Sequence, residues 1–186
     1  MFSIVFPGQG SQKIGMVKEF YEKFDLSKRI FKEADAILNV PITKIIFEGP
    51  DNELNLTENT QPAIFLVSYS IFSLMNSEFN LNLNRAKYFA GHSLGEYSAL
   101  ACANSINFED TIRLLNKRGK SMQNAVPIGE GAMLVILGKE IKEIEKIFKE
   151  ENINDCEIAN DNCPGQVVIS GKTNSIKNLN KILKQM

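Results

Sequence analysis

The stretch that decides the fold is Gly91-His92-Ser93-Leu94-Gly95. The preceding residues 87–90 are apolar and aromatic, a pattern typical of the end of a buried strand. The following residues 96–103 are rich in alanine, which favours a helix. The sequence therefore predicts a strand, a sharp turn with a serine at its tip, and a helix.

A serine between two glycines at a strand-to-helix junction is the pattern of a nucleophile elbow. We expect the turn to strain the backbone of Ser93, and Gly91 and Gly95 to let the strand and the helix pack closely. The Ser93 hydroxyl then stands at a helix N-terminus, where free N–H groups and the helix dipole stabilise a developing oxyanion. The pentapeptide also occurs by chance in ordinary loops. The strand and the helix on its correct sides favour the nucleophile.

Length, charge and hydropathy restrict the remaining possibilities. The 186 residues suit one large domain or a domain with a small appendage, and 44% of them are hydrophobic, which is enough for a core. A formal net charge of -1 gives no general attraction to nucleic acid or to an anionic membrane, so we expect neither as a partner. No apolar run reaches the roughly 18–20 residues of a membrane span. Because the expected strand already begins at residue 2, we expect no cleavable signal.

The cysteines and the histidine argue against a metal centre. Cys102, Cys156 and Cys163 form no C-x-x-C pair, and His92 is the single histidine. Because zinc sites need a cluster of such ligands, we expect no metal. An odd number of cysteines without a pairing pattern is typical of reduced thiols, which predicts a cytoplasmic protein.

Residues 2–6 alternate as a short buried strand does, and the loop at residues 7–12 ends this strand. The glycines and the proline of the loop predict a tight turn that brings backbone N–H groups above the strand end. A phosphate-binding loop is excluded because the Lys-Ser/Thr ending is absent and the glycine spacing differs. Two interpretations stay open, a plain turn or a loop beside the elbow that donates a second N–H to the oxyanion.

Two amphipathic helices are expected next, the second with Ser27 as its N-cap and with Pro41 ending it. Residues 49–59 read as a turn followed by a polar connection. Gln61 and Pro62 then open a helix that is apolar on more than one face, which predicts a helix largely surrounded by protein. Gln61 either approaches the site or makes a hydrogen bond at the helix end.

The helix expected after residue 107 carries a second candidate site residue, Arg118. Asn107 and Asp110 resemble a capping box, and the helix continues through Met122. Its apolar stripe consists of Ile112, Leu115, Gly119 and Met122. Arg118 flanks this stripe, either as a structural salt-bridge partner or as a planar fork that receives a substrate carboxylate.

The linker at residues 125–131 predicts a boundary between two domains, 1–124 and 125–186. Beyond it we expect a strand at 132–137, a helix at 139–150, strands at 155–159 and 165–170, and a helix at 173–185. This β-α-β-β-α order is the split βαβ motif without its final strand. The missing strand leaves open backbone groups on the strand at 132–137, so we expect the isolated chain to aggregate.

Several motifs of the chain occur in an order that is specific when they are taken together. They are Phe6-Pro7-Gly8-Gln9-Gly10-Ser11-Gln12, Thr60-Gln61-Pro62-Ala63, Gly91-His92-Ser93-Leu94-Gly95-Glu96-Tyr97, Arg118-Gly119 with Met122-Gln123, Gly131-Ala132-Met133, and residues 162–171. In these motifs, along its whole length, the chain resembles the malonyl-CoA:acyl-carrier-protein transacylases, or ACP S-malonyltransferases.

The resemblance implies an α/β fold in which residues 1–124 are the N-terminal part of an α/β-hydrolase-like core. Residues 125–186 are then a ferredoxin-like smaller subdomain without its last strand, and both parts are incomplete because the chain ends early. The implied reaction belongs to fatty-acid synthesis. A malonyl group passes from malonyl-CoA to Ser93, and from this malonyl-serine to the phosphopantetheine thiol of an acyl carrier protein. No permanently bound cofactor is implied.

The resemblance also implies residue roles. The backbone N–H groups of Gln9 and Leu94 form the oxyanion hole, and Arg118 binds the malonyl carboxylate, which agrees with the two parallel charge-assisted bonds that an arginine can offer. Further candidates for the pocket lining are Gln61, His92, Met122, Met133 and Asn162.

One departure concerns the general base, which in this family is a histidine in a Pro-Ser-His context that the sequence does not reach. His92 is adjacent to Ser93 and should project away from it, which predicts a structural hydrogen bond. We therefore expect a missing C-terminal half, in the same polypeptide or a second one, to complete the site. The alternative is a truncated chain that binds acyl-CoA or carrier protein without turnover. A generic serine esterase is disfavoured, since the loop at residues 8–10 and Arg118 have no reason to occur together there.

Overall fold

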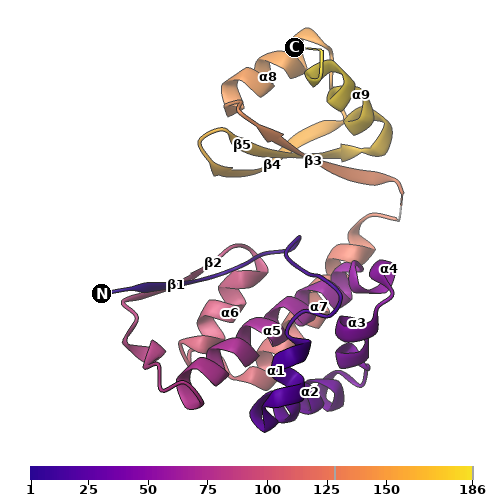
Figure 1. Cartoon of the computed structure of the whole chain (residues 1–186). Helices are drawn as coiled ribbons and strands as arrows, with labels where there is room; N and C mark the ends of the chain where they lie inside the picture. Colours follow the sequence, from indigo (N-terminus) through magenta and orange to yellow (C-terminus); the bar gives the residue numbers. More distant parts are fainter. Residues whose placement is uncertain (128, 186) are drawn as a thin grey trace. The chain divides into compact units, whose positions relative to one another are not determined.

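The computed structural model describes residues 1–127 and 129–185. The chain divides into two compact units, Met1–Asn124 and Ala125–Met186, each of which is described by itself (Figure 1). Ile128, in the linker expected at residues 125–131, and Met186 lie outside the described residues.

Two parallel strands position the loops of the first unit. β1 (Ser3–Phe6) pairs with β2 (Tyr88–Gly91), and the register runs from Ser3 opposite Tyr88 to Phe6 opposite Gly91. Because the strands are parallel, their carboxyl ends lie at the same edge, and the loop after β1 emerges beside the turn after β2. Helix α6 (Leu94–Cys102) follows that turn, so the predicted strand-turn-helix is confirmed.

Helices make up most of the first unit. They are α1 (Lys18–Lys23), α2 (Asp25–Leu38), α3 (Ile42–Glu48), α4 (Asp51–Leu54), α5 (Thr57–Ser77), the 3-10 helix η1 (Leu83–Arg85), α6 and α7 (Phe108–Ala125). Helix α5 runs through the middle of this group and packs against α2 and α6 (Figure 1). Its Phe65 and Leu66 are fully buried together with Phe31 of α2 and Leu115 of α7. The prediction that this helix is surrounded by protein is confirmed.

The prediction that Ser27 is an N-cap is wrong. Helix α2 begins at Asp25, where a carboxylate in the first turn suits the helix dipole. The Lys28 ammonium donates a hydrogen bond to the Asp25 carboxylate at 2.9 Å and holds the pKa of that carboxyl below its ordinary value. Ser27 is instead buried inside the helix, with its Oγ 2.9 Å from Ser70 Oγ of α5.

The segment after α2 contains a helix that the sequence did not indicate. Asn39, in a left-handed conformation, ends α2 two residues before Pro41, which stands at the N-cap of α3. Three isoleucines of α3, Ile42, Ile45 and Ile46, are buried. The helix is only seven residues long, too short for its periodicity to be visible.

The predicted polar connection at residues 54–59 is also wrong. Helix α5 begins at Thr57, which places Pro62 inside the helix. Because proline has no N–H, the carbonyl of Glu58 loses its intrahelical donor. Asn116 Nδ2 of α7 donates to that carbonyl at 3.2 Å and replaces the lost bond.

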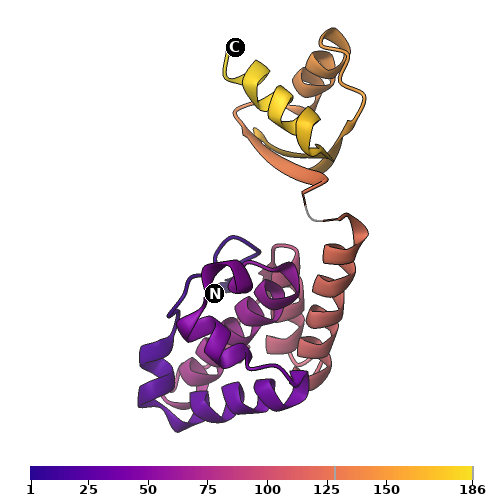
Figure 2. The same cartoon turned by 90° about the vertical axis from the view of Figure 1, so that its right-hand side faces the viewer.

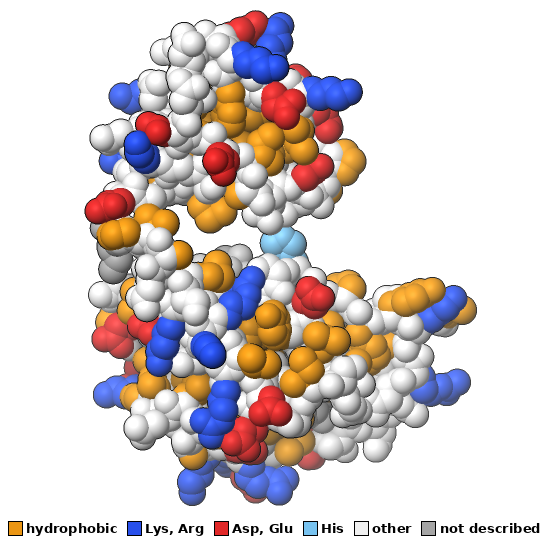
Figure 3. Space-filling view, turned by 180° about the vertical axis from the view of Figure 1, so that it is seen from behind, with side chains coloured by type: hydrophobic (Ala, Val, Ile, Leu, Met, Phe, Trp, Pro, Cys, Tyr) orange, Lys and Arg blue, Asp and Glu red, His pale blue; other side chains and the backbone are white. Residues whose placement is uncertain are grey.

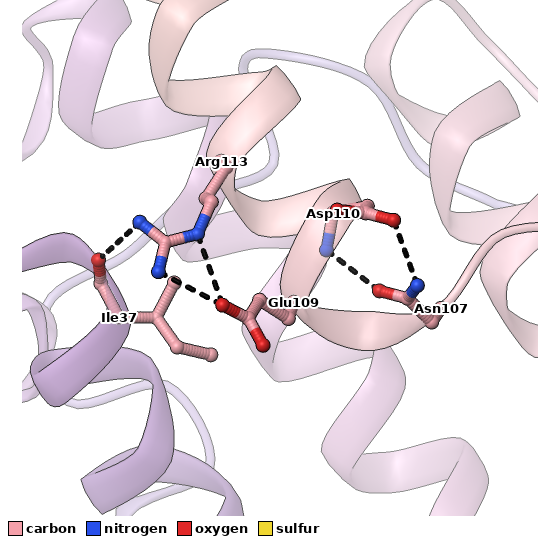
Figure 4. Close-up of polar contacts among 5 residues, drawn as sticks. All are labelled: Ile37, Asn107, Glu109, Asp110 and Arg113. Carbon is pink, nitrogen blue, oxygen red and sulfur yellow. Dashed lines mark hydrogen bonds and ion pairs between the residues drawn. The ribbon is translucent and has the colours of Figure 1, made fainter.

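Helix α7 begins with the predicted capping pair (Figure 4). Asn107 Oδ1 accepts a bond from the Asp110 N–H at 2.7 Å, and the Asn107 side-chain amide donates to Asp110 Oδ2 at 2.7 Å. One turn later, Arg113 forms an ion pair with Glu109 at 2.9 Å and donates to the carbonyl of Ile37 at 3.1 Å. Arg113 thereby joins α7 to the end of α2.

The second unit follows the predicted β-α-β-β-α order. Its elements are β3 (Gly131–Leu137), α8 (Ile141–Glu150), β4 (Cys156–Cys163), β5 (Gln166–Lys172) and α9 (Thr173–Leu183). The strands form an antiparallel sheet in the order β3-β5-β4, and α8 and α9 lie on one face of it (Figures 1 and 2). Strand β4 runs four residues beyond its predicted end, because irregular pairing at Ile158/Asn160 and Asp161/Cys163 carries polar residues along the sheet.

Strand β3 exposes apolar side chains. Met133, Val135 and Leu137 are 62%, 55% and 70% exposed, on the face opposite the buried Ile136. Among the described residues β3 pairs with β5 alone, so it lies at an edge of the sheet, as predicted. The expected aggregation of the isolated chain stays a prediction.

Charges are mixed on the face that Figure 3 shows, where Lys and Arg side chains are interspersed with Asp and Glu. No helix within residues 1–127 and 129–185 is long and apolar enough to cross a membrane. The same residues contain no group of three or more His, Cys, Asp and Glu side chains that could hold a metal ion. Cys102, Cys156 and Cys163 are free thiols.

Candidate active site

Ser93 has the strained backbone that the sequence predicts. Its φ of 54° and ψ of -110° are unusual for a residue with a side chain, and such a conformation costs about 1–3 kcal/mol. Two hydrogen bonds hold the turn, from the Gly95 N–H to the His92 carbonyl at 2.9 Å and from the Glu96 N–H to the Ser93 carbonyl at 3.1 Å. Ser93 itself is exposed.

The two glycines beside Ser93 are needed because backbone packs directly on backbone. A Cβ added to Gly91 would lie 2.0 Å from the carbonyl carbon of Gly95, and one added to Gly95 would lie 2.5 Å from the carbonyl oxygen of Phe6. Neither neighbour is a flexible side chain that could move aside. The expected close packing of the strand and the helix is confirmed, and the first strand also packs against the helix at Gly95.

The loop at residues 7–12 lies against the elbow. A Cβ on Gly8 would come within 2.6 Å of His92 Nδ1, so the histidine ring packs on the loop backbone. Inside the loop, Ser11 Oγ donates to the Gly8 carbonyl at 2.9 Å, and the Gly10 N–H donates to Gln12 Oε1 at 2.8 Å. The loop is thus held both by its own bonds and by the elbow.

Two backbone N–H groups beside the elbow have no acceptor among the residues that the structure describes. One is the N–H of Gln9, the residue after Gly8 in the first loop. The other is the N–H of Leu94, the first residue of α6. Within residues 1–127, neither N–H donates a hydrogen bond. Both groups therefore remain able to bind a ligand oxygen.

Arg118 of α7 reaches the nucleophile. Its Nη2 donates to Ser93 Oγ at 3.0 Å, and its Nη1 donates to Gln61 Oε1 at 2.6 Å. The guanidinium carbon lies 5.9 Å from the centre of the Tyr97 ring. None of the ion pairs among the described residues includes Arg118, so its interpretation as a salt-bridge partner does not hold.

A close helix contact brings Arg118 to this position. A Cβ on Gly119 would lie 2.5 Å from the carbonyl oxygen of Thr57 and 2.6 Å from Glu58 Cα, so α7 touches the first turn of α5 at this glycine. Gln61 lies one turn further along α5 and is completely buried. The sequence placed Gln61 at a helix end, and no local signal marked its bond to a residue of another helix.

The other pocket candidates fall in both units. Met122 of α7 is 49% exposed, and its Sδ accepts a hydrogen bond from Gln61 Nε2 at 3.2 Å. In the second unit, Met133 lies on the exposed side of β3, and Asn162 Nδ2 donates to Gln166 Oε1 at 3.1 Å. The structure thus brings Ser93, Arg118, Gln61 and Met122 together, and the roles of Met133 and Asn162 stay predictions.

A separate apolar groove of about 470 Å³ lies between β1 and α5. Ile4, Phe6, Ile64, Val67 and Phe72 are among its lining residues, which include neither Ser93 nor Arg118. The groove is therefore distinct from the polar site around the nucleophile.

The geometry suits attack on an acyl group that carries a negative charge. Because Ser93 Oγ accepts its bond from Arg118, its own hydroxyl hydrogen is free to pass to a base. A cation 3.0 Å from the nucleophile can also hold an anionic group close to the reacting carbon. The free N–H groups of Gln9 and Leu94 could receive the charge that develops on the carbonyl oxygen.

Known proteins with similar sequences and structures include malonyl transacylases. The chain is 42% identical to the malonyl CoA-acyl carrier protein transacylase of Bacillus subtilis (strain 168), over 98% of the chain and 57% of the relative. The crystal structure of an acyl-carrier-protein-S-malonyltransferase from Bartonella henselae has a TM-score of 0.89 and 43% identity, and it is matched over 60% of its length by all of this chain. A type II PKS acyl-carrier protein in complex with its malonyl-transacylase gives a TM-score of 0.84 at 41% identity, over 95% of this chain and 56% of the matched chain.

The chain thus spans somewhat more than half the length of the relatives that it matches. The predicted α/β fold class and the resemblance to malonyltransferases are confirmed by these matches. Residues 3–186 match the family described as acyl transferase domain, and the chain belongs to this family.

Proposed function

We propose that this chain carries the nucleophile and the carboxylate-binding residue for transfer of a malonyl group from malonyl-CoA to an acyl carrier protein. The observation that carries the proposal is the 3.0 Å bond from Arg118 Nη2 to Ser93 Oγ. It combines a serine on a strained turn with a guanidinium that has no carboxylate partner in the described residues. The malonyl carboxylate can form charge-assisted hydrogen bonds with this guanidinium, whereas a neutral acyl group has no charge to pair with it.

In the proposed reaction, Ser93 Oγ attacks the thioester carbonyl of malonyl-CoA while its proton passes to a base. The N–H groups of Gln9 and Leu94 stabilise the oxyanion, and the carbon–sulfur bond then breaks to release CoA. The phosphopantetheine thiol of the carrier protein attacks the resulting malonyl-serine, and Ser93 regains its proton. Arg118 moves its bond from Ser93 Oγ to the malonyl carboxylate. No resident cofactor takes part.

We infer that the general base comes from a segment outside these 186 residues, in the same polypeptide or in a second one. His92 is the single histidine of the sequence, and its ring packs against Gly8 of the first loop. The Bacillus subtilis relative is longer than this chain, since the match covers only 57% of it. The apolar groove between β1 and α5 is a surface that a completing segment could cover.

The resemblance to malonyltransferases also suggests which subdomain each unit corresponds to. We propose that residues 1–124 are the N-terminal part of an α/β-hydrolase-like core and residues 125–186 a ferredoxin-like subdomain without its last strand. The order β3-β5-β4 leaves β3 at an edge where one more strand can pair. We keep Met133 and Asn162 of the second unit as candidates for the pocket lining that the resemblance implies. The free thiols suit the reducing cytoplasm.

Radiolabelled malonyl-CoA tests the proposal. The chain is incubated with it alone, and also with the remaining segment of the Bacillus subtilis relative expressed separately. We expect label on Ser93 and none on the Ser93→Ala variant. Absence of label on Ser93 in both mixtures would contradict the proposed function.

The carboxylate role has its own control on the same helix. Arg118→Ala should reduce labelling by malonyl-CoA far more than labelling by acetyl-CoA. Arg113→Ala removes an arginine that is already paired with Glu109, and it should leave the ratio of malonyl to acetyl labelling unchanged. Equal losses with both acyl donors in Arg118→Ala would remove the carboxylate-binding role.

A second candidate function is binding of acyl-CoA or carrier protein without turnover. It is favoured by the position of His92, which packs against Gly8. Complete turnover by residues 1–186 alone would exclude it, and binding of malonyl-CoA without acylation of Ser93 in both mixtures would support it.

A further inference from the structure

Gln61 is a buried polar residue that links α5 to the guanidinium of the site. Its exposed fraction is 0%, and both ends of its amide are bonded. Oε1 accepts from Arg118 Nη1 at 2.6 Å, and Nε2 donates to Met122 Sδ at 3.2 Å. The bonds continue from Arg118 Nη2 to Ser93 Oγ, so Gln61 belongs to one chain of contacts that ends at the nucleophile.

Met122 determines which way the amide faces. A thioether sulfur can only accept a hydrogen bond, so the NH2 group of Gln61 must point to Met122. The amide oxygen is then directed at Arg118, where it serves as a fixed acceptor. Rotation of the amide would leave two acceptors facing each other at the sulfur and two donors facing each other at the guanidinium.

The charge of this acceptor matters as much as its position. Arg113, on the same helix, is neutralised by Glu109 at 2.9 Å. Arg118 is half-buried, and its fixed acceptor is a neutral amide. A half-buried guanidinium held by a neutral group keeps its full charge for a ligand, whereas one paired with a buried carboxylate would not.

We propose that Gln61 is the positioning residue that sets the charge selectivity of the site, because it orients Arg118 without neutralising it. The inference rests on the proposed function and deepens it. The preference for an acyl group with a carboxylate then depends on an uncharged residue in the core of α5 as well as on the arginine that meets the substrate.

The test replaces the amide by a carboxylate of the same size. In Gln61→Glu, Arg118 acquires a charged partner within the protein. We expect the affinity for malonyl-CoA, measured by titration calorimetry, to fall at least about tenfold. The affinity for acetyl-CoA should change by less than about threefold, since no substrate charge is involved. Gln123→Glu is the matched control, because it makes the same chemical change on α7 and should leave the ratio of the two affinities unaltered.

The outcomes separate this inference from the proposed function. If Arg118→Ala leaves the affinity for malonyl-CoA unchanged, or the unaltered chain does not bind malonyl-CoA, the proposed function fails and this inference with it. If Arg118→Ala lowers that affinity but Gln61→Glu keeps the ratio within about threefold of its original value, this inference alone is overturned.

Circular dichroism verifies that Gln61→Glu is folded. Should it not fold, Gln61→Leu provides the second test, because it removes the acceptor without adding charge. It should lower the affinity for malonyl-CoA more than that for acetyl-CoA. Equal losses would indicate a purely structural role and would overturn the inference.

Discussion

The two units of the molecule achieve their packing in different ways. In the first unit, three glycines bring backbone against backbone. Gly91 and Gly95 join strand, loop and helix around Ser93, and Gly119 joins α7 to α5 beside Arg118. In the second unit, Gly171 is packed in this manner, since an added Cβ would lie 2.4 Å from the Asp155 carbonyl oxygen, whereas an added Cβ at Gly138 would meet nothing within 4 Å. Close backbone contacts therefore gather where the proposed chemistry is.

The difference shows which part of the chain tolerates change. Side chains of the second unit fill the space between a regular sheet and two amphipathic helices, and such packing relaxes when one member is altered. Backbone contacts in the first unit have no side chain that can adjust. The site of the first unit should consequently be more sensitive to small substitutions than the core of the second unit.

The largest expected effect is that of Gly91→Ala. The added methyl group would lie 2.0 Å from backbone atoms of Gly95, so the variant should lose more than about 3 kcal/mol of unfolding free energy. Urea denaturation followed by circular dichroism measures the loss. Gly131→Ala in the second unit is the control. Its methyl group would meet only the side chain of Val126, at 2.9 Å, and should cost less than about 1 kcal/mol. Equal costs would remove the contrast between the units.

A smaller effect is expected from Ser27→Ala, which leaves Ser70 Oγ buried without its partner at 2.9 Å. The cost should be about 1–3 kcal/mol, and the double variant with Ser70→Ala should lose less than the sum of the two single losses. In the second unit, Lys172→Ala breaks an ion pair with Asp155 in which the lysine side chain is 73% exposed, and it should cost less than about 1 kcal/mol. Additive losses at Ser27 and Ser70 would show that their contact contributes nothing.

The last expected effect is smallest near neutral pH and concerns the thiols. Burial raises the pKa of the Cys102 thiol in the first unit from its ordinary value of 9.0 to about 12. Because the folded pKa is the higher one, this thiol stabilises the fold below pH 9, and that contribution is lost as the pH rises from 9 to 12. At pH 8, an alkylating reagent followed by mass spectrometry should modify the exposed Cys163 first and the buried Cys102 and Cys156 much later. Equal rates would contradict the burial of these two thiols.

The second unit was the more predictable from the sequence. Alternating apolar residues in β3 and amphipathic repeats in α8 and α9 are local patterns, and they placed these elements to within about two residues. The end of β4 was missed because the polar residues Asn160 and Asp161 resemble a loop, although the sheet carries them through irregular pairing.

In the first unit, the sequence predicted the elbow but not what surrounds it. The glycines beside Ser93 predicted a tight turn, because the turn requires small residues at positions next to the serine in the sequence. The start of α5 was missed because the bond from Asn116 that supports the helix through Pro62 comes from a residue far along the chain. The bond between Gln61 and Arg118 was not predicted for the same reason. It joins two helices that meet at Gly119 only in the folded chain.

The contact between Gly8 and His92 has a consequence for how the site works. It holds the first loop against the elbow, so folding places Gln9 and Leu94 on neighbouring segments before any thioester binds. If these residues supply the oxyanion hole, as we propose, the hole is pre-organised by folding. The loss of conformational entropy that its assembly requires then occurs once in the lifetime of the protein and is not repeated in every turnover.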